Sequence, residues 1–166
     1  CRFDSGYIAG DITLPETQAK LFAEIRRWNT EIDVVIATPP CQGMSVANHK
    51  KNNEMARNSL VVESIKIVRE VQPKFFIFEN VKAFLNTPCT DTDHQEKPIE
   101  EAIWSNLGGH YNILSNVLNF KDYGANSSRT RTLVIGVRKD IHHITPYDIF
   151  PKQTPPKTLR TLLADL

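Results

Sequence analysis

The sequence has few of the features that mark membrane, secreted or metal-binding proteins. It contains no apolar run long enough to cross a bilayer, and its first residues do not resemble a signal peptide. Its 166 residues include only three cysteines, and no CxxC pair or Cys/His cluster has the spacing of metal ligands. These absences argue against a disulfide-stapled secreted domain and a structural metal site, and they favour a reducing, intracellular setting.

Net charge is also almost absent. The 20 Lys and Arg residues nearly balance the 19 Asp and Glu residues, for a formal charge of +1. Whole-chain charge therefore gives no sign of a nucleic-acid partner, which must be argued from local features. With 40% hydrophobic residues, the chain has enough apolar material for the core of one domain. Because it begins with Cys1 rather than Met, we expect a fragment or a processed product.

The most informative stretch is residues 32–37 (Ile-Asp-Val-Val-Ile-Ala), which Thr38, two prolines and Cys41 follow. This nearly continuous apolar run predicts a buried parallel strand, and Pro39 and Pro40 should end it because proline cannot donate to a sheet ladder. We therefore expect Cys41 on a loop at the carboxyl end of the strand, where open α/β sheets bind their ligands. A thiol in that position is a candidate nucleophile.

Similar patterns predict the other elements. They indicate helices that begin near Pro15 and cover residues 60–71 and 99–107, and strands over residues 6–12, 75–78, 111–120 and 132–137. The strand over 6–12 should pair in parallel with 32–37 through a right-handed crossover, whereas the last two strands should form an antiparallel hairpin. Residues 86–98 are predicted to be a loop. The expected fold class is α/β, with a mostly parallel sheet and an antiparallel hairpin in its C-terminal part.

A second predicted strand end carries a carboxylate. Glu79 follows the apolar residues 75–78, so this strand should bring Glu79 to the same sheet edge as Cys41. Between them, residues 46–58 are polar without apolar periodicity, which fits either a solvated loop or a mobile loop that closes over a polyanion. His94, which lies near two aspartates in the sequence, is interpreted as part of a solvated turn rather than as a metal ligand.

Four short motifs follow one another in a characteristic order. They are Gly10-Asp11-Ile12, Pro40-Cys41-Gln42, Glu79-Asn80-Val81 and Arg129-Thr130-Arg131. Each triplet alone is a weak pattern, but together, each at its expected strand end, they resemble the cytosine-5 DNA methyltransferase family. The resemblance covers nearly the whole chain and implies a Rossmann-like, S-adenosylmethionine-dependent methyltransferase core that is truncated at both ends.

The resemblance implies a catalytic role for three residues. Carbon 5 of cytosine is a poor nucleophile, so the Cys41 thiolate must first add to carbon 6. Arg131 would favour the thiolate and contact the base oxygen, and Glu79, kept protonated by a dry site, would act at the ring nitrogen N3. Taken singly, Glu79 could equally cap the following helix, and the two arginines of the last motif could lie in a solvated hairpin.

The same resemblance implies S-adenosylmethionine as cofactor and double-stranded DNA as substrate. Asp11 would accept a hydrogen bond from the adenine amino group, Ile12 would pack on the ring and Pro40 would line the pocket, although Asp11 also fits an ordinary turn after Gly10. Because the target carbon lies inside a duplex, the base must be flipped out. The polar loop over residues 43–57 would act as a lid in which Ser45 contacts a phosphate, and Arg129 would hold this lid or the DNA backbone.

Several family features are absent or altered. The glycine-rich first motif and the acidic ribose-binding residue would precede residue 1, and the target-recognition domain and last motifs would follow residue 166. Family members carry Gln at the position of Ser127 and usually Pro at Asn126. We therefore expect residues 1–150 to be a partial catalytic domain and residues 151–166 to be a linker to an absent target-recognition domain. Such a chain should be inactive without a polypeptide that carries the missing motifs.

Three other functions compete with this one. The chain could be a noncatalytic or split-enzyme partner, which complementation with the missing motifs would test. It could be an RNA cytosine-5 methyltransferase of the same fold, which labelled methyl transfer to RNA and DNA would separate. A cysteine hydrolase would need a histidine beside Cys41, and only His49 lies near it in the sequence. The compact spacing of the motifs favours a restriction-modification setting, in the cytoplasm or nucleoid of a bacterium.

Overall fold

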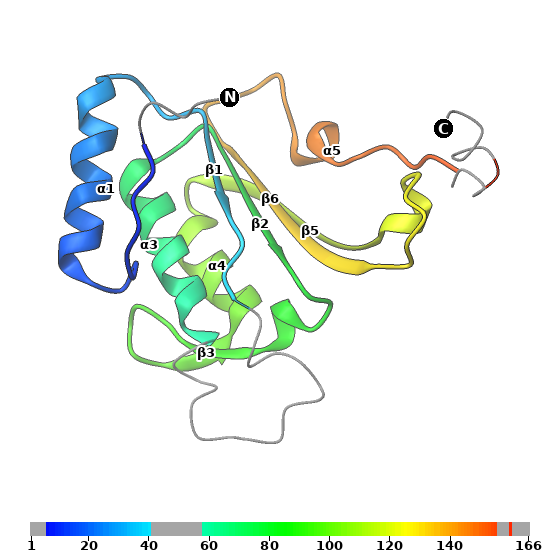
Figure 1. The fold of residues 1–166 in the computed structure, drawn as a ribbon, viewed down its shortest axis with the longest axis horizontal. Helices are drawn as coiled ribbons and strands as arrows, with labels where there is room; N and C mark the ends of the chain where they lie inside the picture. The colour runs from blue at the N-terminus through cyan, green and yellow to red at the C-terminus, as the bar shows by residue number, and fades with distance from the viewer. Residues whose placement is uncertain (1–5, 41–57, 156–159, 161–166) are drawn as a thin grey trace.

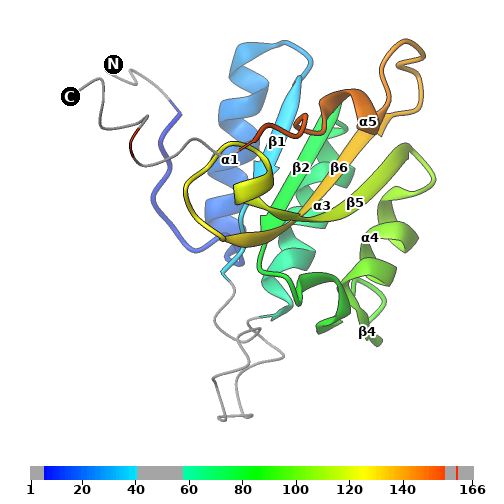
Figure 2. The ribbon, with the colours of Figure 1, turned by 90° about the vertical axis from the view of Figure 1, so that its right-hand side faces the viewer.

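The computed structural model describes residues 6–40, 58–155 and 160. A four-stranded sheet in the order β1-β2-β6-β5 lies at its centre (Figure 1). The strands are β1 (Val34–Ala37), β2 (Phe75–Asn80), β5 (Tyr111–Asn119) and β6 (Thr130–Arg138). β1 and β2 are parallel, and β6 is inserted antiparallel between β2 and β5. Figure 2 shows the four strands side by side in this order.

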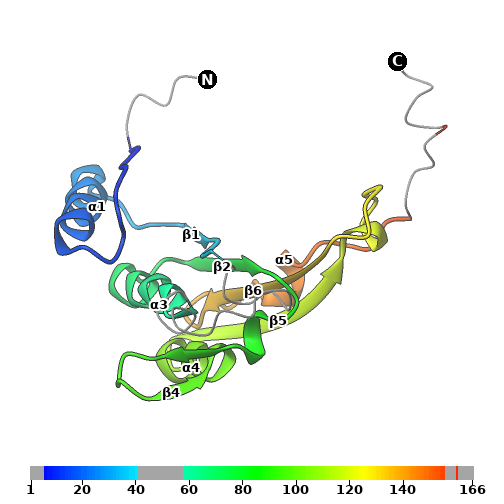
Figure 3. The same ribbon diagram turned by 60° about the horizontal axis from the view of Figure 1, so that its bottom comes forward.

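Helices cover the sheet unequally. The α-helices are α1 (Pro15–Trp28), α3 (Leu60–Val71), α4 (Ile99–Leu107) and α5 (Pro146–Ile149). Figure 3 shows α3 and α4 on one face of the sheet, α5 on the other side and α1 beyond the β1 edge. Smaller elements are the hairpin of β3 (Pro88–Thr90) and β4 (Glu96–Pro98) and the 3-10 helices η2 (Phe84–Asn86) and η3 (Phe120–Asp122). None of the helices in the described ranges is long and apolar enough to cross a membrane.

The helix ends follow from local sequence. Pro15 occupies the first turn of α1, where its fixed φ suits a helix and its missing N–H costs nothing. Asn29 and Gln72 end α1 and α3 in the left-handed conformation, with φ of 46° and 50°. Pro73 follows the second of these ends and prevents continuation of the helix.

The core lies between β2 and the α3–α4 layer. Phe76 and Phe78 occupy alternate positions of β2, so both side chains point into this core. Both are fully buried, as are Ile65 of α3 and Ile99 of α4. Burying side chains of this size contributes about 1.5–3 kcal/mol each. The buried Tyr111 hydroxyl donates a hydrogen bond to the Pro73 carbonyl at 2.8 Å. This hydrogen bond joins the start of β5 to the connection between α3 and β2.

The structure confirms the α/β class, the predicted helices and the antiparallel pairing of the last two strands. The sheet is mixed, parallel between β1 and β2 and antiparallel elsewhere. The strand predicted over residues 6–12 is wrong: no strand forms there, because the Asp11 side chain accepts from the N–H and the hydroxyl of Thr13 and folds a turn. The parallel pairing predicted for this segment is therefore wrong as well.

Two further expectations need correction. β1 is not buried on both faces, since Val34 is 44% and Ile36 66% exposed. Residues 86–98 are not a plain loop, because they contain the β3–β4 hairpin. Lys97 stabilises this hairpin by pairing with Asp91 at 3.1 Å and with Asp93 at 2.7 Å. Its strands are only three residues long, too short to show an alternation in the sequence.

The chain after β6 returns to the β5–β6 connection. α5 begins with a capping box formed by Thr145 and Asp148 and contacts β5 and β6. Thr154 then forms an isolated parallel bridge with Tyr123 and donates its N–H to the Asp122 carbonyl at 2.9 Å. Residues up to 155 are thus attached to the connection that precedes the Arg129-Thr130-Arg131 motif.

Candidate active site

Three strand ends lie together at one end of the sheet, where β1 and β2 finish and β6 begins. β1 runs parallel to β2, with Ala37 opposite Phe78, so the residues that follow Ala37 lie at the same end as Glu79. β6 runs the other way and begins at this edge, with Leu133 opposite Glu79. The register therefore brings the ends of two strands and the start of a third together, although they come from three separate parts of the sequence.

Glu79 and Arg131 form an ion pair across β2 and β6. Arg131 Nε lies 3.0 Å from Glu79 Oε1, and the two side chains are 18% and 30% exposed. Since Glu79 is opposite Leu133, this is a diagonal cross-strand pair on the face away from α3 and α4. Arg131 also donates from Nη1 to the Thr130 carbonyl at 2.8 Å, which fixes its guanidinium plane. The pair presents a positive and a negative group side by side at the sheet edge.

Asn80 is a site residue that the sequence reasoning missed. Its side chain is 3% exposed, donates from Nδ2 to the Pro39 carbonyl at 2.8 Å and accepts the Val81 N–H at Oδ1 at 2.8 Å. The amide thus joins the end of β1 to the end of β2. The available signal was a second polar residue at the end of an apolar strand, where polar burial needs a partner.

Cys41 and Ser45 lie outside the described residues, and the description of β1 and its extension ends at Pro40. Cys89, by contrast, is fully buried in the core beside α4. Burial, with a further contribution from the Asp91 carboxylate, raises the pKa of the Cys89 thiol to about 11. A neutral, shielded thiol cannot act as a nucleophile, so Cys89 is a packing residue.

Arg129 is exposed and directly precedes β6. Its carbonyl accepts the Phe120 N–H at 2.9 Å, which closes the connection between β5 and β6. The backbone around Arg129 is therefore anchored, while the side chain extends into solvent close to Arg131 in the chain. Such a placement allows a contact with a phosphate at the rim of the site.

Asp11 and Ile12 form the turn that leads into α1. The N–H and hydroxyl of Thr13 donate to Asp11 Oδ1 at 2.9 and 2.8 Å, and these two hydrogen bonds lower the pKa of Asp11. Gln18 Nε2 donates to the Ile12 carbonyl and to Glu63 of α3, both at 2.9 Å. The contacts described for this turn run to α1 and α3 and do not join it to Pro40 or to the Glu79–Arg131 pair.

The residues predicted to hold the cofactor fit it only in part. Asp11 is exposed and both Thr13 hydrogen bonds reach its Oδ1, which leaves Oδ2 as an acceptor for an amino group. Ile12 is half-buried and offers an apolar surface, and Pro40 is exposed. These groups suit one edge of an adenine ring. None of the three lines the pockets that are described for residues 6–40 and 58–155.

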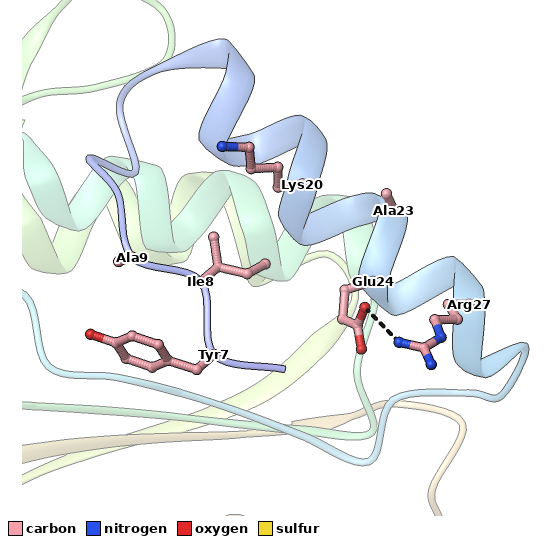
Figure 4. Close-up of a pocket in the computed structure, with 7 residues that line it drawn as sticks. All are labelled: Tyr7, Ile8, Ala9, Lys20, Ala23, Glu24 and Arg27. Atoms are coloured by element: carbon pink, nitrogen blue, oxygen red, sulfur yellow. Dashed lines mark ion pairs between the residues drawn. The ribbon is translucent and has the colours of Figure 1, made fainter. Parts of the chain in front are cut away.

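A pocket lies elsewhere, beside α1. It has a volume of about 540 Å³ and is an open furrow between residues 7–9 and α1 (Figure 4). Figure 4 shows Ile8 pointing toward α1 and Tyr7 pointing away, with the Glu24–Arg27 ion pair of 3.6 Å on the helix wall. None of the three predicted cofactor residues lines this furrow.

The acidic turn around His94 has a structural explanation. Lys97 pairs with the carboxylates of Asp91 and Asp93, and Asn106 donates to Asp91 Oδ1 at 2.8 Å. Within the described ranges, no group of three or more His, Cys, Asp or Glu side chains is arranged to hold a metal ion. The carboxylates of this turn therefore serve the hairpin and its contact with α4.

The sequence is similar to a protein family and to individual methyltransferases. A model of the family described as C-5 cytosine-specific DNA methylase matches residues 4–166. The chain is 33% identical to Type II methyltransferase M.XorII of Xanthomonas oryzae pv. oryzae, covering 82% of this chain and 30% of that protein. It is 35% identical to Type II methyltransferase M.AquIA of Picosynechococcus sp., covering 81% and 55% respectively.

A solved structure agrees with these matches. The crystal structure of a DNA modification methyltransferase encoded within an E. coli prophage superposes with a TM-score of 0.66 at 29% identity. The match covers 93% of this chain and 40% of that one. The matched part of the chain covers 30% to 55% of the length of these relatives.

Proposed function

Because the chain belongs to the C-5 cytosine-specific DNA methylase family, we propose that it is the central part of an enzyme that methylates carbon 5 of cytosine in DNA. The observation that carries this proposal is the Glu79–Arg131 ion pair of 3.0 Å, which lies at the sheet edge where Pro39 and Pro40 extend β1. Two motifs 50 residues apart in the sequence are thereby joined at the place where open α/β sheets carry their chemistry.

In the proposed reaction Cys41 is the nucleophile. Its thiolate adds to carbon 6 of cytosine, and the electron pair of the 5,6 double bond becomes available at carbon 5. Carbon 5 would then take the methyl group as the bond between that group and the donor sulfur breaks, the carbon 5 proton would pass to a solvent base, and elimination of the thiolate would restore the double bond. Cys89 is unsuited to this role because it is fully buried and its thiol pKa is raised to about 11.

Glu79 and Arg131 act together on the base. In cytosine the ring nitrogen N3 and the oxygen on carbon 2 are neighbouring atoms, so two groups held 3.0 Å apart can reach both of them. The Glu79 carboxyl, in its protonated form, would donate its proton to N3 as the thiolate adds to carbon 6 and would take it back when the thiolate is eliminated. Arg131 would contact the oxygen and favour the Cys41 thiolate. The cross-strand pairing holds both side chains near this arrangement before the base arrives.

S-adenosylmethionine, when bound, supplies the methyl group to carbon 5. Of the residues in this chain, Asp11 accepts from the adenine amino group through its remaining oxygen, Ile12 packs against the ring and Pro40 lines the pocket. The partial fit of these residues supports a cofactor site that further polypeptide completes.

Double-stranded DNA is the proposed substrate, and the target base leaves the duplex to reach Cys41. Ser45 and Arg129 contact the DNA backbone. The exposed side chain of Arg129, on an anchored backbone beside Arg131, supports this assignment. A methyltransferase of a restriction-modification system is the setting that the type II relatives suggest.

A further polypeptide that carries the remaining motifs completes the enzyme in this proposal. β1 is the last strand of the described sheet, and its side chains Val34 and Ile36 are 44% and 66% exposed. An apolar edge strand of this kind is a surface for pairing and packing with additional chain. Residues 1–166 alone are therefore expected to be inactive, with residues 151–166 leading toward a target-recognition domain.

Covalent trapping tests the proposed chemistry. A complete enzyme that contains residues 1–166 is incubated with S-adenosylmethionine and a duplex containing 5-fluorocytosine, in which fluorine blocks the final elimination. We expect an adduct at Cys41 by peptide mass spectrometry, lost in Cys41→Ser and retained in the control Cys89→Ala. The isolated 166-residue chain should form none.

The other outcomes separate the competing functions. Trapping on a 5-fluorocytosine RNA but not on DNA would assign the enzyme to RNA. Absence of an adduct on either nucleic acid would favour a noncatalytic partner. An adduct formed by the isolated chain would contradict the need for further polypeptide.

A further inference from the structure

We propose that Asn80 is a positioning residue, which fixes the extension of β1 that leads to Cys41 relative to the Glu79–Arg131 ion pair. This inference rests on the methyltransferase function proposed above. Glu79 and Asn80 are consecutive residues of β2, so their side chains point to opposite faces of the sheet. One holds Arg131, and the other holds Pro39.

The need for such a residue follows from the two prolines. The β1–β2 register runs from Val34 opposite Phe75 to Ala37 opposite Phe78. Beyond it, Pro39 and Pro40 have no N–H and cannot continue a ladder by donating to a neighbouring strand. The Pro39 carbonyl still requires a donor, and Asn80 Nδ2 supplies it at 2.8 Å. The side-chain amide of Asn80 thus joins β2 to the residues after β1, beyond the last backbone pair of the two strands.

Asn80 is held in turn by its own surroundings. Its Oδ1 accepts the Val81 N–H at 2.8 Å, so both ends of the amide are engaged and its orientation is fixed. Thr132, the cross-strand partner of Asn80 in β6, is fully buried and donates its hydroxyl to the Val81 carbonyl at 3.1 Å. Val81 is therefore held at its N–H by β2 and at its carbonyl by β6.

This buried cluster joins the three strand ends that carry the chemistry. Asn80 follows Glu79, Thr132 follows Arg131, and Pro39 lies two residues before Cys41. A displacement of the β1 extension would change the distance between the nucleophile and the groups that activate the base. A shift of about 1 Å at such a site can lower a rate by roughly 100-fold.

The test uses the isosteric variant Asn80→Asp in a complete enzyme that contains residues 1–166. A carboxylate keeps the acceptor for the Val81 N–H and loses the donor to the Pro39 carbonyl. The shorter variant Asn80→Ser loses the reach to Pro39 by a different route. Asn112→Ala, which changes an exposed asparagine of β5, is the matched control.

The readouts are the rate of adduct formation on a 5-fluorocytosine duplex, kcat, the KM values for S-adenosylmethionine and DNA, and the unfolding midpoint. For Asn80→Asp we expect adduct formation and kcat to fall roughly 10- to 100-fold while both KM values stay within about twofold. A merely structural residue would lower the unfolding midpoint and leave the kcat of the folded enzyme unchanged.

Two results would overturn the positioning role. One is a folded Asn80→Asp or Asn80→Ser enzyme that forms the adduct at the wild-type rate. The other is failure of both variants to fold, which would assign Asn80 to stability alone. A wild-type enzyme that forms no adduct would instead overturn the methyltransferase function, which keeps the two failures distinct.

Discussion

The Glu79–Arg131 pair depends on the shape of the arginine side chain. Arg131 uses Nε for Glu79 and Nη1 for the Thr130 carbonyl, so two donors of one rigid plane serve two partners. A lysine carries a point charge on a flexible stem and cannot reproduce this fork. The interaction is partly exposed to solvent, so its value lies in orientation rather than in stability.

Arg131→Lys should therefore separate activity from stability. We expect adduct formation on the 5-fluorocytosine duplex to fall by roughly 10- to 100-fold, because the plane that orients Glu79 is lost. The free energy of unfolding should change by less than about 1 kcal/mol, as for other partly exposed ion pairs. Urea denaturation and single-turnover assays measure the two quantities, with Arg26→Lys on the exposed side of α1 as control. A large loss of stability with unchanged activity would contradict this role.

At the scale of elements, β6 can lie beside β2 only because of a glycine. Gly136 is the cross-strand partner of Phe76, and an added Cβ would overlap the buried Phe76 ring. Phe76 also packs against Phe78 and Tyr111, with ring centroids 4.9 and 5.1 Å apart, so it has little freedom to move. The central strand pair that aligns Arg131 with Glu79 is therefore sensitive to one methyl group.

Gly136→Ala should destabilise the chain by about 1–3 kcal/mol, the usual cost of overpacking a core. Gly109→Ala is the matched control, because nothing lies within 4 Å of its added Cβ. Urea denaturation of the 166-residue chain measures the difference. Equal stability of the two variants would mean that Phe76 can repack, and the close approach of β2 and β6 would then not depend on Gly136.

The same comparison of elements shows what the sequence could predict. Apolar patterns located α1, α3, α4, β2, β5 and β6 correctly. Helical spacing of apolar residues indicated α1 and α3, and a continuous apolar run indicated β2. The segment over 6–12 failed because an aspartate side chain can redirect a short apolar run into a turn. The β3–β4 hairpin failed because its stability comes from Lys97 pairing with Asp91, a contact that no local pattern reveals.

The closeness of Glu79 and Arg131 was also predictable in part, whereas their roles stay a prediction. Motif order placed Glu79 and Arg131 in one site, and the structure brings them to 3.0 Å. Local pattern alone could not give this pairing, because it requires β6 to insert between β2 and β5, and sequence reasoning paired β6 only with β5. Asn80 was missed for a related reason: its partner Pro39 lies 41 residues away.

At the scale of the whole molecule, the β1 side of the sheet is open as far as residues 6–40 and 58–155 are concerned. Ile36 is 66% exposed on the face opposite to α3 and α4. On the same face Ile135 and Val137 of β6 are buried, and α5 contacts β6. An apolar strand with one open face and one open edge is typical of a surface that further chain covers.

Ile36→Thr tests this cover directly. Threonine keeps the β-branched shape that suits a strand and removes apolar surface. In the isolated 166-residue chain the change should alter the free energy of unfolding by less than about 0.5 kcal/mol, because the side chain is already largely in water. In a complete enzyme that contains residues 1–166, the same change should lower the free energy of unfolding by about 1–3 kcal/mol, since a buried hydroxyl would replace packed methyl groups.

Val117→Thr on β5, where valine is 42% exposed, is the control and should have a small effect in both proteins. An equally small effect of Ile36→Thr in both would mean that β1 stays open in the complete enzyme, and the remaining motifs would then have to dock elsewhere on the sheet.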